Sequence, residues 1–320
     1  MIADGAGLSQ ITAALYENDN KLNLENFKVI GFQKTHAINS LITDSAASGT
    51  AMACGIKTIN GAIGVDPENK PYESILKICE KKGYNSGMIV TSSIVHATPA
   101  SFYANVVSRS EYQEIAYQLA KSEVDFFIGG GEKHFIKRND KKNLINEMKE
   151  WEFVNSLDGF DSSTSKKVGY FISYEEPPTL KEGRKPLLDN GLNSILKKLN
   201  SRNEPFFLLV EGSQVDWGGH DNDLEYVTSE YIEFDRAIGV ALKFIDEYPN
   251  TLLVVTADHE TGGLAITSNK IDKLNSKARF STKGHSATMV PVFSKGIGSK
   301  EFSGIYDNTE IFFKMMFQIN

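Results

Sequence analysis

Acidic, imidazole and hydroxyl side chains recur just after short apolar runs in this sequence of 320 residues. Such runs, rich in Val, Ile, Leu and Phe and without strict alternation, are typical of strands covered on both faces of a parallel sheet. Ligands bind beside the carboxyl ends of such strands, so we expect these side chains to meet in one crevice. The residues concerned are Asp4, His96, Thr98, Glu211, Asp216, His220, Asp258 and His259.

A metal-binding interpretation depends on the whole set rather than on any one residue. Carboxylate oxygens and imidazole nitrogens without thiolates suit Zn²⁺ in a hydrolytic site and leave an all-oxygen pocket for Mg²⁺. A single Asp-His pair after a strand is more often a capping or surface pair. Asp216 and His220 lie four residues apart, and His285 follows downstream. Together with Asp258 and His259, they favour a metal site.

The segment 43–55 contains a candidate nucleophile. Its small residues and terminal glycine predict a helix whose first turn holds Asp44 and Ser45. A serine there faces free backbone N–H groups and the positive end of the helix dipole, which together bind anions. Considered alone, Ser45 is more often a helix N-cap. Beside two divalent cations it becomes a candidate nucleophile, because a metal can stabilise a serine alkoxide near neutral pH.

The alternation of apolar runs and helical patterns predicts the α/β class. We expect a three-layer sandwich with a mostly parallel central sheet and helices on both faces. Strands are expected at residues 86–93, 124–128, 206–210, 251–256 and 289–293. Helices are expected at 111–121, 187–200 and 228–247. In the last of these, apolar residues recur at helical spacing, which indicates a stripe packed in the core.

We interpret residues 1–320 as one catalytic domain, because no repeat and no linker rich in Pro, Gly and Ser divides the chain. A peripheral excursion is expected at about 132–183, with a short helix near Leu144 and edge strands. The first residues, Met1 to Ala3, look like the end of a strand that runs into a Gly-rich turn. We therefore expect an upstream strand, and any export signal before it, to be missing from this sequence.

Composition argues against several classes of function. The 41 acidic residues outnumber the 34 basic ones, and the basic residues are scattered, which argues against a nucleic-acid partner. No apolar stretch approaches the roughly 18 to 20 residues that cross a bilayer. Cys54 and Cys79 are too few for a disulfide framework or a thiolate zinc site, and free thiols are favoured over one disulfide. A structural or surface role is favoured for His36 and His134.

Four segments together resemble the alkaline phosphatase family, and the match covers nearly the whole chain in the right order. They are Asp-Ser-Ala-Ala-Ser-x-Thr-Ala around Ser45, Val-Glu-Gly-Ser-x-x-Asp leading to His220, Thr-Ala-Asp-His at 256–259, and Gly-His at 284–285 followed by Val-Pro-Val at 290–292. The resemblance implies hydrolysis of small phosphate monoesters through a phosphoserine intermediate, with activity rising toward alkaline pH. It also implies two Zn²⁺ ions and one Mg²⁺ ion around a phosphate pocket.

The resemblance assigns roles to those motif residues that are present here. The ligands of the first zinc ion would be Asp216, His220 and His285. Those of the second would be Asp4, Asp258, His259 and the oxygen of Ser45, the nucleophile. Asp4 would bridge to magnesium, whose other protein ligands would be Thr98 and Glu211. Arg109 matches the family's phosphate-clamping arginine, whose fork suits two phosphate oxygens at once.

Asp44, His96 and Trp217 are expected around these ligands rather than among them. His96 stands where the best-known bacterial pattern has an aspartate, and Trp217 where it has a lysine, so the surroundings of magnesium and the metal preference should change. The stretch between Gly263 and His285 is short. The large insertion that some members carry near the subunit interface is therefore expected to be absent, which leaves both a compact monomer and a homodimer open.

Other functions stay open at this stage. The enzymatic alternative is a phosphodiesterase or sulfatase-like metallohydrolase of the same superfamily, although Ser45 with Arg109 favours monoesters. The alternative from another class is a truncated, inactive homologue that binds metal or phosphate, because Asp4 would then lie on an unanchored terminus. The resemblance implies a periplasmic or secreted location, and we recognise no signal stretch in the sequence as given.

Overall fold

The computed structural model of the protein describes residues 1–267 and 278–319. Its longer helices are α1 (Leu8–Glu17), α2 (Ser45–Cys54), α3 (Ile75–Lys81), α4 (Ala97–Tyr103), α5 (Tyr112–Ala120), α9 (Leu188–Ser201), α10 (Gln214–Asp221), α11 (Leu224–Glu247) and α12 (Thr309–Met316). Shorter ones are α6 (Lys133–Ile136), α7 (Leu144–Glu147), α8 (Leu157–Ser162) and the 3₁₀ helices η1 (Asn23–Asn26) and η3 (Ser299–Phe302).

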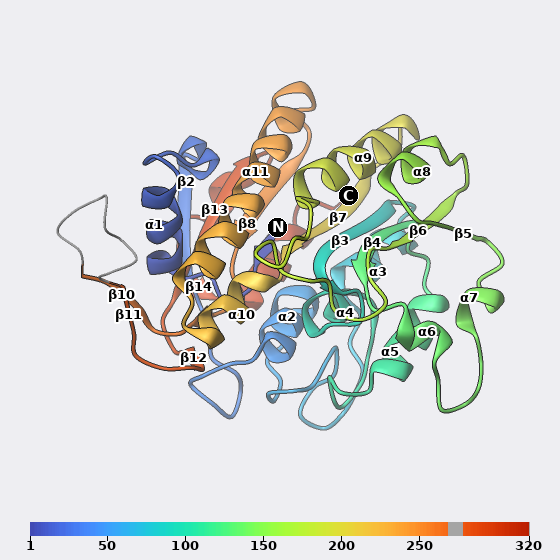
Figure 1. Ribbon diagram of the computed structural model, residues 1–320, viewed down its shortest axis with the longest axis horizontal. Coiled ribbons are helices and arrows are strands. Elements are labelled where there is room, and N and C mark those ends of the chain that lie inside the picture. Colours follow the sequence, from blue (N-terminus) through green and yellow to red (C-terminus); the bar gives the residue numbers. More distant parts are fainter. Residues whose placement is uncertain (268–277, 320) are drawn as a thin grey trace.

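A ten-stranded sheet runs through the molecule in the order β14-β2-β13-β8-β1-β7-β3-β4-β6-β5 (Figure 1). Its strands are β1 (Ile2–Ala3), β2 (Val29–Lys34), β3 (Asn85–Ser93), β4 (Phe126–Gly130), β5 (Trp151–Val154), β6 (Lys167–Phe171), β7 (Phe206–Gly212), β8 (Leu252–Thr256), β13 (Val290–Gly296) and β14 (Gly304–Asp307). Strand β13 runs antiparallel to both of its neighbours. The other pairings in this sheet are parallel, which confirms the predicted mostly parallel sheet.

Helices cover both faces of the sheet, so the predicted three-layer sandwich is also confirmed (Figure 1). On one face α2, α3, α4, α5 and α12 contribute to a single hydrophobic cluster. On the other, α1, α8, α9 and α11 contribute to a second cluster. The helix predicted at 228–247 is α11, and its apolar stripe, which includes Tyr231, Phe234 and Ile238, is buried as predicted.

The five predicted strands all occur, as β3, β4, β7, β8 and β13, with ends that differ by a few residues. The predicted helices correspond to α5, α9 and α11. The sequence analysis did not identify β2 and β14, which lie toward one end of the sheet and are only partly buried. The excursion at about 132–183 contains α7, which begins at Leu144, and β5 and β6, which extend the central sheet beyond β4.

Strand β1 is short but is held on both sides. Ile2 pairs with Glu211 of β7 and with Thr256 of β8, both in parallel. The backbone N–H of Asp4 then donates to the carbonyl of Gly212 at 3.1 Å. Asp4 is thus anchored in the middle of the sheet, and the unanchored terminus expected for an inactive homologue is not what the structure shows.

Two small antiparallel pairs complete the strands: β9 (Glu260–Thr261) with β12 (His285–Ser286), and β10 (Leu264–Ile266) with β11 (Ala278–Phe280). The stretch between Gly263 and His285, where we expected no large insertion, lies partly outside the described residues. Among the helices of the described ranges, none combines the length and the apolar character needed to cross a membrane. Cys54 and Cys79 are buried free thiols, as predicted.

Candidate active site

Three neighbouring strands bring predicted ligands together at one edge of the sheet. Asp4 follows β1, Glu211 lies near the end of β7, and Asp258 and His259 follow β8. Because β1 lies between β7 and β8, side chains from distant parts of the chain meet at its carboxyl end. All four are buried.

Helix α10 and strand β12 supply a second group at the same edge. Asp216 and His220 lie one turn apart on α10, so their side chains face the same way. His285 Nε2 lies 3.1 Å from His220 Nε2 and 3.5 Å from Asp216 Oδ1. His220 Nε2 lies 3.3 Å from Asp216 Oδ2. The three residues predicted to bind the first zinc ion are therefore in mutual contact.

Ser45 is the first residue of α2, and Asp44 is its N-cap. The Asp44 carboxylate accepts the N–H of Ala47 at 2.9 Å, so the interpretation of Ser45 as the N-cap is wrong. The helix ends at Gly55, whose φ of 70° lies in the left-handed region that favours glycine at a helix end. Because Asp44 takes the capping role, the Ser45 hydroxyl is free for other contacts.

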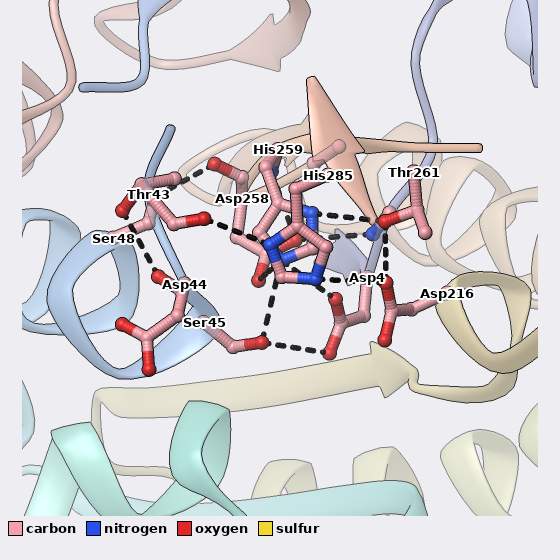
Figure 2. A network of polar contacts seen from close by, with 12 residues as sticks. Asp4, Thr43, Asp44, Ser45, Ser48, Asp216, Asp258, His259, Thr261 and His285 are labelled. Atoms are coloured by element: carbon pink, nitrogen blue, oxygen red, sulfur yellow. Dashed lines mark hydrogen bonds and ion pairs between the residues drawn. The ribbon is translucent and has the colours of Figure 1, made fainter. Parts of the chain in front are cut away.

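The Ser45 hydroxyl faces the predicted ligands of the second zinc ion (Figure 2). Its Oγ donates to Asp4 Oδ2 at 3.4 Å and lies 3.3 Å from His259 Nε2. His259 Nε2 also lies 3.4 Å from Asp4 Oδ1 and 3.2 Å from Asp258 Oδ2. These four side chains, from α2 and from the ends of β1 and β8, form one compact group.

Each imidazole predicted to bind zinc has its Nδ1 atom beside an oxygen. The partners are the Lys283 carbonyl for His220 at 2.5 Å, the Thr43 carbonyl for His285 at 2.8 Å and Thr261 Oγ1 for His259 at 3.2 Å. A carbonyl oxygen can only accept, so Nδ1 carries the proton in His220 and His285. In a neutral ring, Nε2 then has a lone pair, and the Nε2 atoms point toward the carboxylates.

The two Nε2 atoms of His220 and His285 provide a test of whether a cation fits. They lie 3.1 Å apart, and two lone pairs facing each other at this distance repel unless a proton or a cation lies between them. The hydrogen bond with Asp216 raises the pKa of His220 to about 9, so a proton on His220 satisfies this contact in the metal-free chain and a zinc ion would replace it. Zinc binds imidazole nitrogen and carboxylate oxygen together, and Asp216 supplies the oxygen. The donor set of this group fits a zinc ion.

Burial raises the pKa of three carboxyl groups at this edge. Burial and the nearby charge of Asp258 raise the pKa of Asp4 well above its usual range. Burial raises the pKa of Glu211 to about 8, and burial with the charge of Asp216 raises that of Asp258 to about 6. Cations would relieve the crowding of buried negative charge that these shifts report.

Asp216 behaves differently from the other carboxyl groups. Burial alone would raise its pKa, but the hydrogen bond with His220 and the charge of His285 hold that pKa well below its usual range. Burial, together with the charge of His285, lowers the pKa of His259 well below its usual value. A neutral His259 keeps a nitrogen lone pair available to a metal ion.

Several buried oxygen atoms at this edge make no hydrogen bond within the described residues. They are Asp4 Oδ1, Thr98 Oγ1, Glu211 Oε1 and Asp258 Oδ2. A buried oxygen without a partner is costly, and such atoms in native structures often mark an ion or a water molecule. Mg²⁺ takes oxygen ligands, so Asp4, Thr98 and Glu211 fit the predicted magnesium site.

In the part of the chain that the structure describes, three groups of side chains are close enough to hold an ion. They are Asp216 with His220 and His285, Asp4 with Asp216 and His259, and Asp4 with His96 and Glu211. The third group includes His96, which we expected near the ligands rather than among them. Burial and the charge of Arg109 lower the pKa of His96 to about 3, so its ring is neutral and has a lone pair to offer.

Arg109 lies beside the amino terminus of α2, at the end of the loop that precedes α5. Its Nη1 donates to Asp44 Oδ2 at 3.0 Å, and its Nη2 lies 3.1 Å from His96 Nε2. The backbone N–H of Arg109 donates to the Gly61 carbonyl at 2.7 Å. The rings of Trp217 and His96 are nearly perpendicular, with centroids 6.2 Å apart. Asp44 and His96 therefore both touch the arginine predicted to clamp phosphate.

Within the described residues, His36 and His134 lie outside the three candidate ion-binding groups. His36 is 42% exposed, and its Nε2 lies 3.8 Å from Asp307 Oδ2. The ring of His134 packs on Tyr112, with centroids 4.9 Å apart.

Sequence analysis missed the hydroxyl groups of Ser213 and Thr261, which hydrogen-bond predicted ligands. Ser213 donates to Glu211 Oε2 at 2.7 Å, and Thr261 donates to Asp216 Oδ1. Ser213 lies within a recognised motif, and Thr261 lies two residues beyond another. Nothing in one sequence distinguishes such hydroxyl groups from other buried ones, because the bonds depend on how distant segments pack.

A comparison with protein families gives a match to alkaline phosphatase over residues 1–278. The chain belongs to the alkaline phosphatase family. The matched range contains the predicted site residues except His285, which the structure places beside His220.

Known members of the alkaline phosphatase family are similar over most of this chain. Alkaline phosphatase 3 of Bacillus subtilis is 36% identical over 290 residues, which cover 85% of this chain and 62% of that protein. Alkaline phosphatase 4 of the same organism is 33% identical, with coverage of 97% and 71%. The repressible alkaline phosphatase of Saccharomyces cerevisiae is 35% identical, with coverage of 84% and 55%. The chain thus spans 55% to 71% of the length of these relatives.

Two solved alkaline phosphatases share the whole fold. The enzyme from the Antarctic bacterium TAB5 has a TM-score of 0.95 and 42% identity, and the match covers 99% of this chain and 96% of that one. The cold-active enzyme from Shewanella sp. has a TM-score of 0.92 and 29% identity, with coverage of 100% and 98%.

Proposed function

We propose that this chain hydrolyses phosphate monoesters to an alcohol and inorganic phosphate through a phosphoserine intermediate on Ser45. The observation that carries the proposal is the position of the Ser45 hydroxyl, at the amino terminus of α2 and within 3.4 Å of both Asp4 and His259. The N–H groups of a helix terminus attract a phosphate group. Family membership and the likeness to the Antarctic enzyme support the proposal.

The proposed cofactors are two Zn²⁺ ions and one Mg²⁺ ion. The first zinc ion would be held by Asp216, His220 and His285, the second by Asp4, Asp258, His259 and Ser45, and magnesium by Asp4, Thr98 and Glu211. When bound, these cations would lower the pKa of the attacking hydroxyl and neutralise charge on the phosphoryl group. A variant of the Antarctic enzyme has been solved with magnesium in its M3 site, which supports a magnesium site here.

The chain's own residues would attack the phosphorus atom, orient the phosphate group and stabilise its charge. Ser45 Oγ forms a bond to phosphorus as the ester P–O bond breaks and the alcohol leaves. Water then displaces Ser45 from phosphorus and releases inorganic phosphate. Arg109, held by Asp44, presents its fork to two phosphate oxygens and stabilises the charge that they carry.

Replacing Ser45 tests the nucleophile. Ser45→Ala should lower turnover of a chromogenic phosphate monoester by on the order of 10³-fold or more, because the covalent route is removed. Its zinc and magnesium content should stay close to that of the parent, because carboxylates and imidazoles remain. Ser101→Ala is a matched control, since Ser101 is a buried serine of the neighbouring helix α4 whose hydroxyl donates to the carbonyl of Ala97 in its own helix, at 2.8 Å.

Two outcomes would contradict the proposal. Parent-like turnover by Ser45→Ala would remove the nucleophile assignment. A parent chain that binds zinc but hydrolyses no ester would favour the inactive homologue. Comparing a monoester, a diester and a sulfate ester of one chromogenic alcohol decides the substrate class, and we expect the monoester to react fastest.

The cellular location and the oligomeric state of the protein remain predictions. We propose a periplasmic or secreted enzyme, and either a monomer or a homodimer, on the basis of family membership. The interpretation as a single domain is likewise a prediction. Gel filtration with light scattering would measure the oligomeric state directly.

A further inference from the structure

Thr261 lies between two groups of predicted zinc ligands. It belongs to the short strand β9, and its side chain is fully buried. Its Oγ1 donates to Asp216 Oδ1, a predicted ligand of the first zinc ion. The same oxygen lies 3.2 Å from Nδ1 of His259, a predicted ligand of the second. Figure 2 shows these contacts meeting at the Thr261 hydroxyl.

The direction of both hydrogen bonds follows from counting protons. A threonine hydroxyl has one proton, and the ionised carboxylate of Asp216 can only accept it. His259 Nδ1 must then donate its own proton to Thr261 Oγ1. That arrangement leaves the lone pair of the His259 ring on Nε2, the atom that faces Asp4 and Asp258.

Thr261 accepts a hydrogen bond from Nδ1 of His259, as backbone carbonyls do from Nδ1 of the other two imidazoles. His220 and His285 donate from Nδ1 to the carbonyls of Lys283 and Thr43. Among the imidazoles of these two zinc groups, His259 is therefore oriented by a side chain instead of by the backbone. A side chain can be replaced, so its contribution can be measured.

The structure holds the Thr261 side chain in one position. Its backbone N–H donates to the Gly5 carbonyl at 3.1 Å, and its carbonyl accepts from Gln10 Nε2 at 2.8 Å. A Cβ on Gly5 would come within 2.9 Å of Thr261 Oγ1, and one on Gly219 would come within 2.9 Å of Thr261 Cβ. Both glycines thus leave the space that Thr261 fills, and a β-branched side chain has few alternative rotamers there.

We propose that Thr261 is a positioning residue that couples the two zinc groups, by orienting Asp216 and by holding His259 with Nε2 free. The inference rests on the proposed zinc sites. Residues that orient metal ligands typically contribute about 10- to 100-fold to metal affinity. Because one hydroxyl contacts a ligand in each group, its loss should weaken the binding of both zinc ions.

Two substitutions separate the hydroxyl from the packing. Thr261→Val keeps the branched shape and removes the hydroxyl, whereas Thr261→Ser keeps the hydroxyl and removes the methyl group. Thr228→Val is the matched control, because Thr228 is a buried threonine of α11 whose hydroxyl bonds the carbonyl of Glu225 in its own helix. Zinc bound per chain is measured by atomic absorption after dialysis against buffered free-zinc concentrations.

We expect Thr261→Val to need about 10- to 100-fold more free zinc for half-saturation of both ions. Thr261→Ser should stay within a few-fold of the parent, and Thr228→Val should match it. Parent-like zinc binding by Thr261→Val, or a large loss in Thr261→Ser, would overturn the inference in favour of packing alone. If Thr261→Val does not fold, the zinc binding of Thr261→Ser alone decides whether the hydroxyl or the methyl group of Thr261 is responsible. A parent that binds no zinc would refute the proposed cofactors, and the inference with them.

Discussion

Arg109 is held in position by hydrogen bonds to other groups of the protein. Asp44 accepts from one of its nitrogens, and the backbone N–H of Arg109 donates to the carbonyl of Gly61. Asp44 also accepts from the N–H groups of Ala47 and Gly61, so it joins the arginine, the start of α2 and the loop that follows α2. Such preorganisation lowers the entropy lost when an anion binds.

Removing Arg109 should therefore damage phosphate binding more than folding. For Arg109→Ala we expect kcat/KM on a phosphate monoester to fall by about 10²-fold and inhibition by inorganic phosphate to weaken in parallel. Arg236→Ala, at an arginine that is 41% exposed on α11, is the control. Steady-state kinetics and a melting curve measure both effects. A lower melting temperature with unchanged kinetics would show that the role of Arg109 is structural.

Helix α2 can place Ser45 at the strand ends because it packs closely against its neighbours. All ten of its residues are buried, and they are mostly small. A Cβ on Gly49 would come within 2.7 Å of the Ser101 hydroxyl on α4, so the glycine lets these two helices approach. This close packing holds the amino terminus of α2, and with it the nucleophile, against the edge of the sheet.

Helix α3 contains a buried acid whose ionisation should affect stability. Glu80 accepts from the Ser86 hydroxyl of β3 at 2.7 Å, and burial raises its pKa to about 7. A carboxyl group whose pKa is raised by folding stabilises the protein at low pH, where it is protonated. That contribution is present below the ordinary pKa and is lost as the pH rises through about 7.

Glu80→Gln should remove this dependence, because glutamine stays neutral and can still accept from Ser86. We compare the free energy of unfolding of the variant with that of the parent at each pH. The advantage of the variant should be about 1 to 3 kcal/mol larger at pH 8.5 than at pH 5.5. Glu310→Gln, at an exposed glutamate of α12, is the control and should change little. Denaturant unfolding at both pH values measures the difference. An equal gain at the two pH values would contradict the assignment.

At the scale of the whole molecule, the sheet concentrates buried acidic groups from distant segments at one edge. Burial raises the pKa of Asp4, Glu211 and Asp258, so in the absence of cations each resists ionisation. In the metal-free chain, these groups stabilise the folded state below their ordinary pKa values. The stability is lost as the pH rises through about 6 for Asp258 and about 8 for Glu211.

Metal removal should therefore lower stability and activity together, and more strongly at high pH. After exhaustive chelation we expect the melting temperature to fall by at least about 5 °C at pH 8.5 and by less at pH 5.5. Zinc and magnesium together should restore both properties. Scanning calorimetry and an ester assay on the same samples provide the measurement. Full activity after chelation would contradict the metal assignment.

The sequence alone was enough to predict the class of fold and to identify candidate metal ligands that the structure brings together. Short apolar runs identify buried strands because burial on both faces excludes polar residues locally, and acids and imidazoles after those runs indicate metal ligands whatever the exact packing. Asp4 and His259 could therefore be predicted to meet although they are far apart in the chain, whereas the expectation that Ser45 joins them came from the resemblance to the alkaline phosphatase family. The partly exposed strands β2 and β14 have no comparably strong local signal, and we missed them.

Only the tertiary structure decided how these residues are oriented. It made Asp44 the N-cap in place of Ser45, grouped His96 with Asp4 and Glu211, and placed Thr261 between Asp216 and His259. Residue type determines which donors and acceptors exist, and local periodicity determines most of the strands and helices. The direction of a lone pair depends on partners from other segments, and these come together only when the sheet and its two layers of helices are assembled.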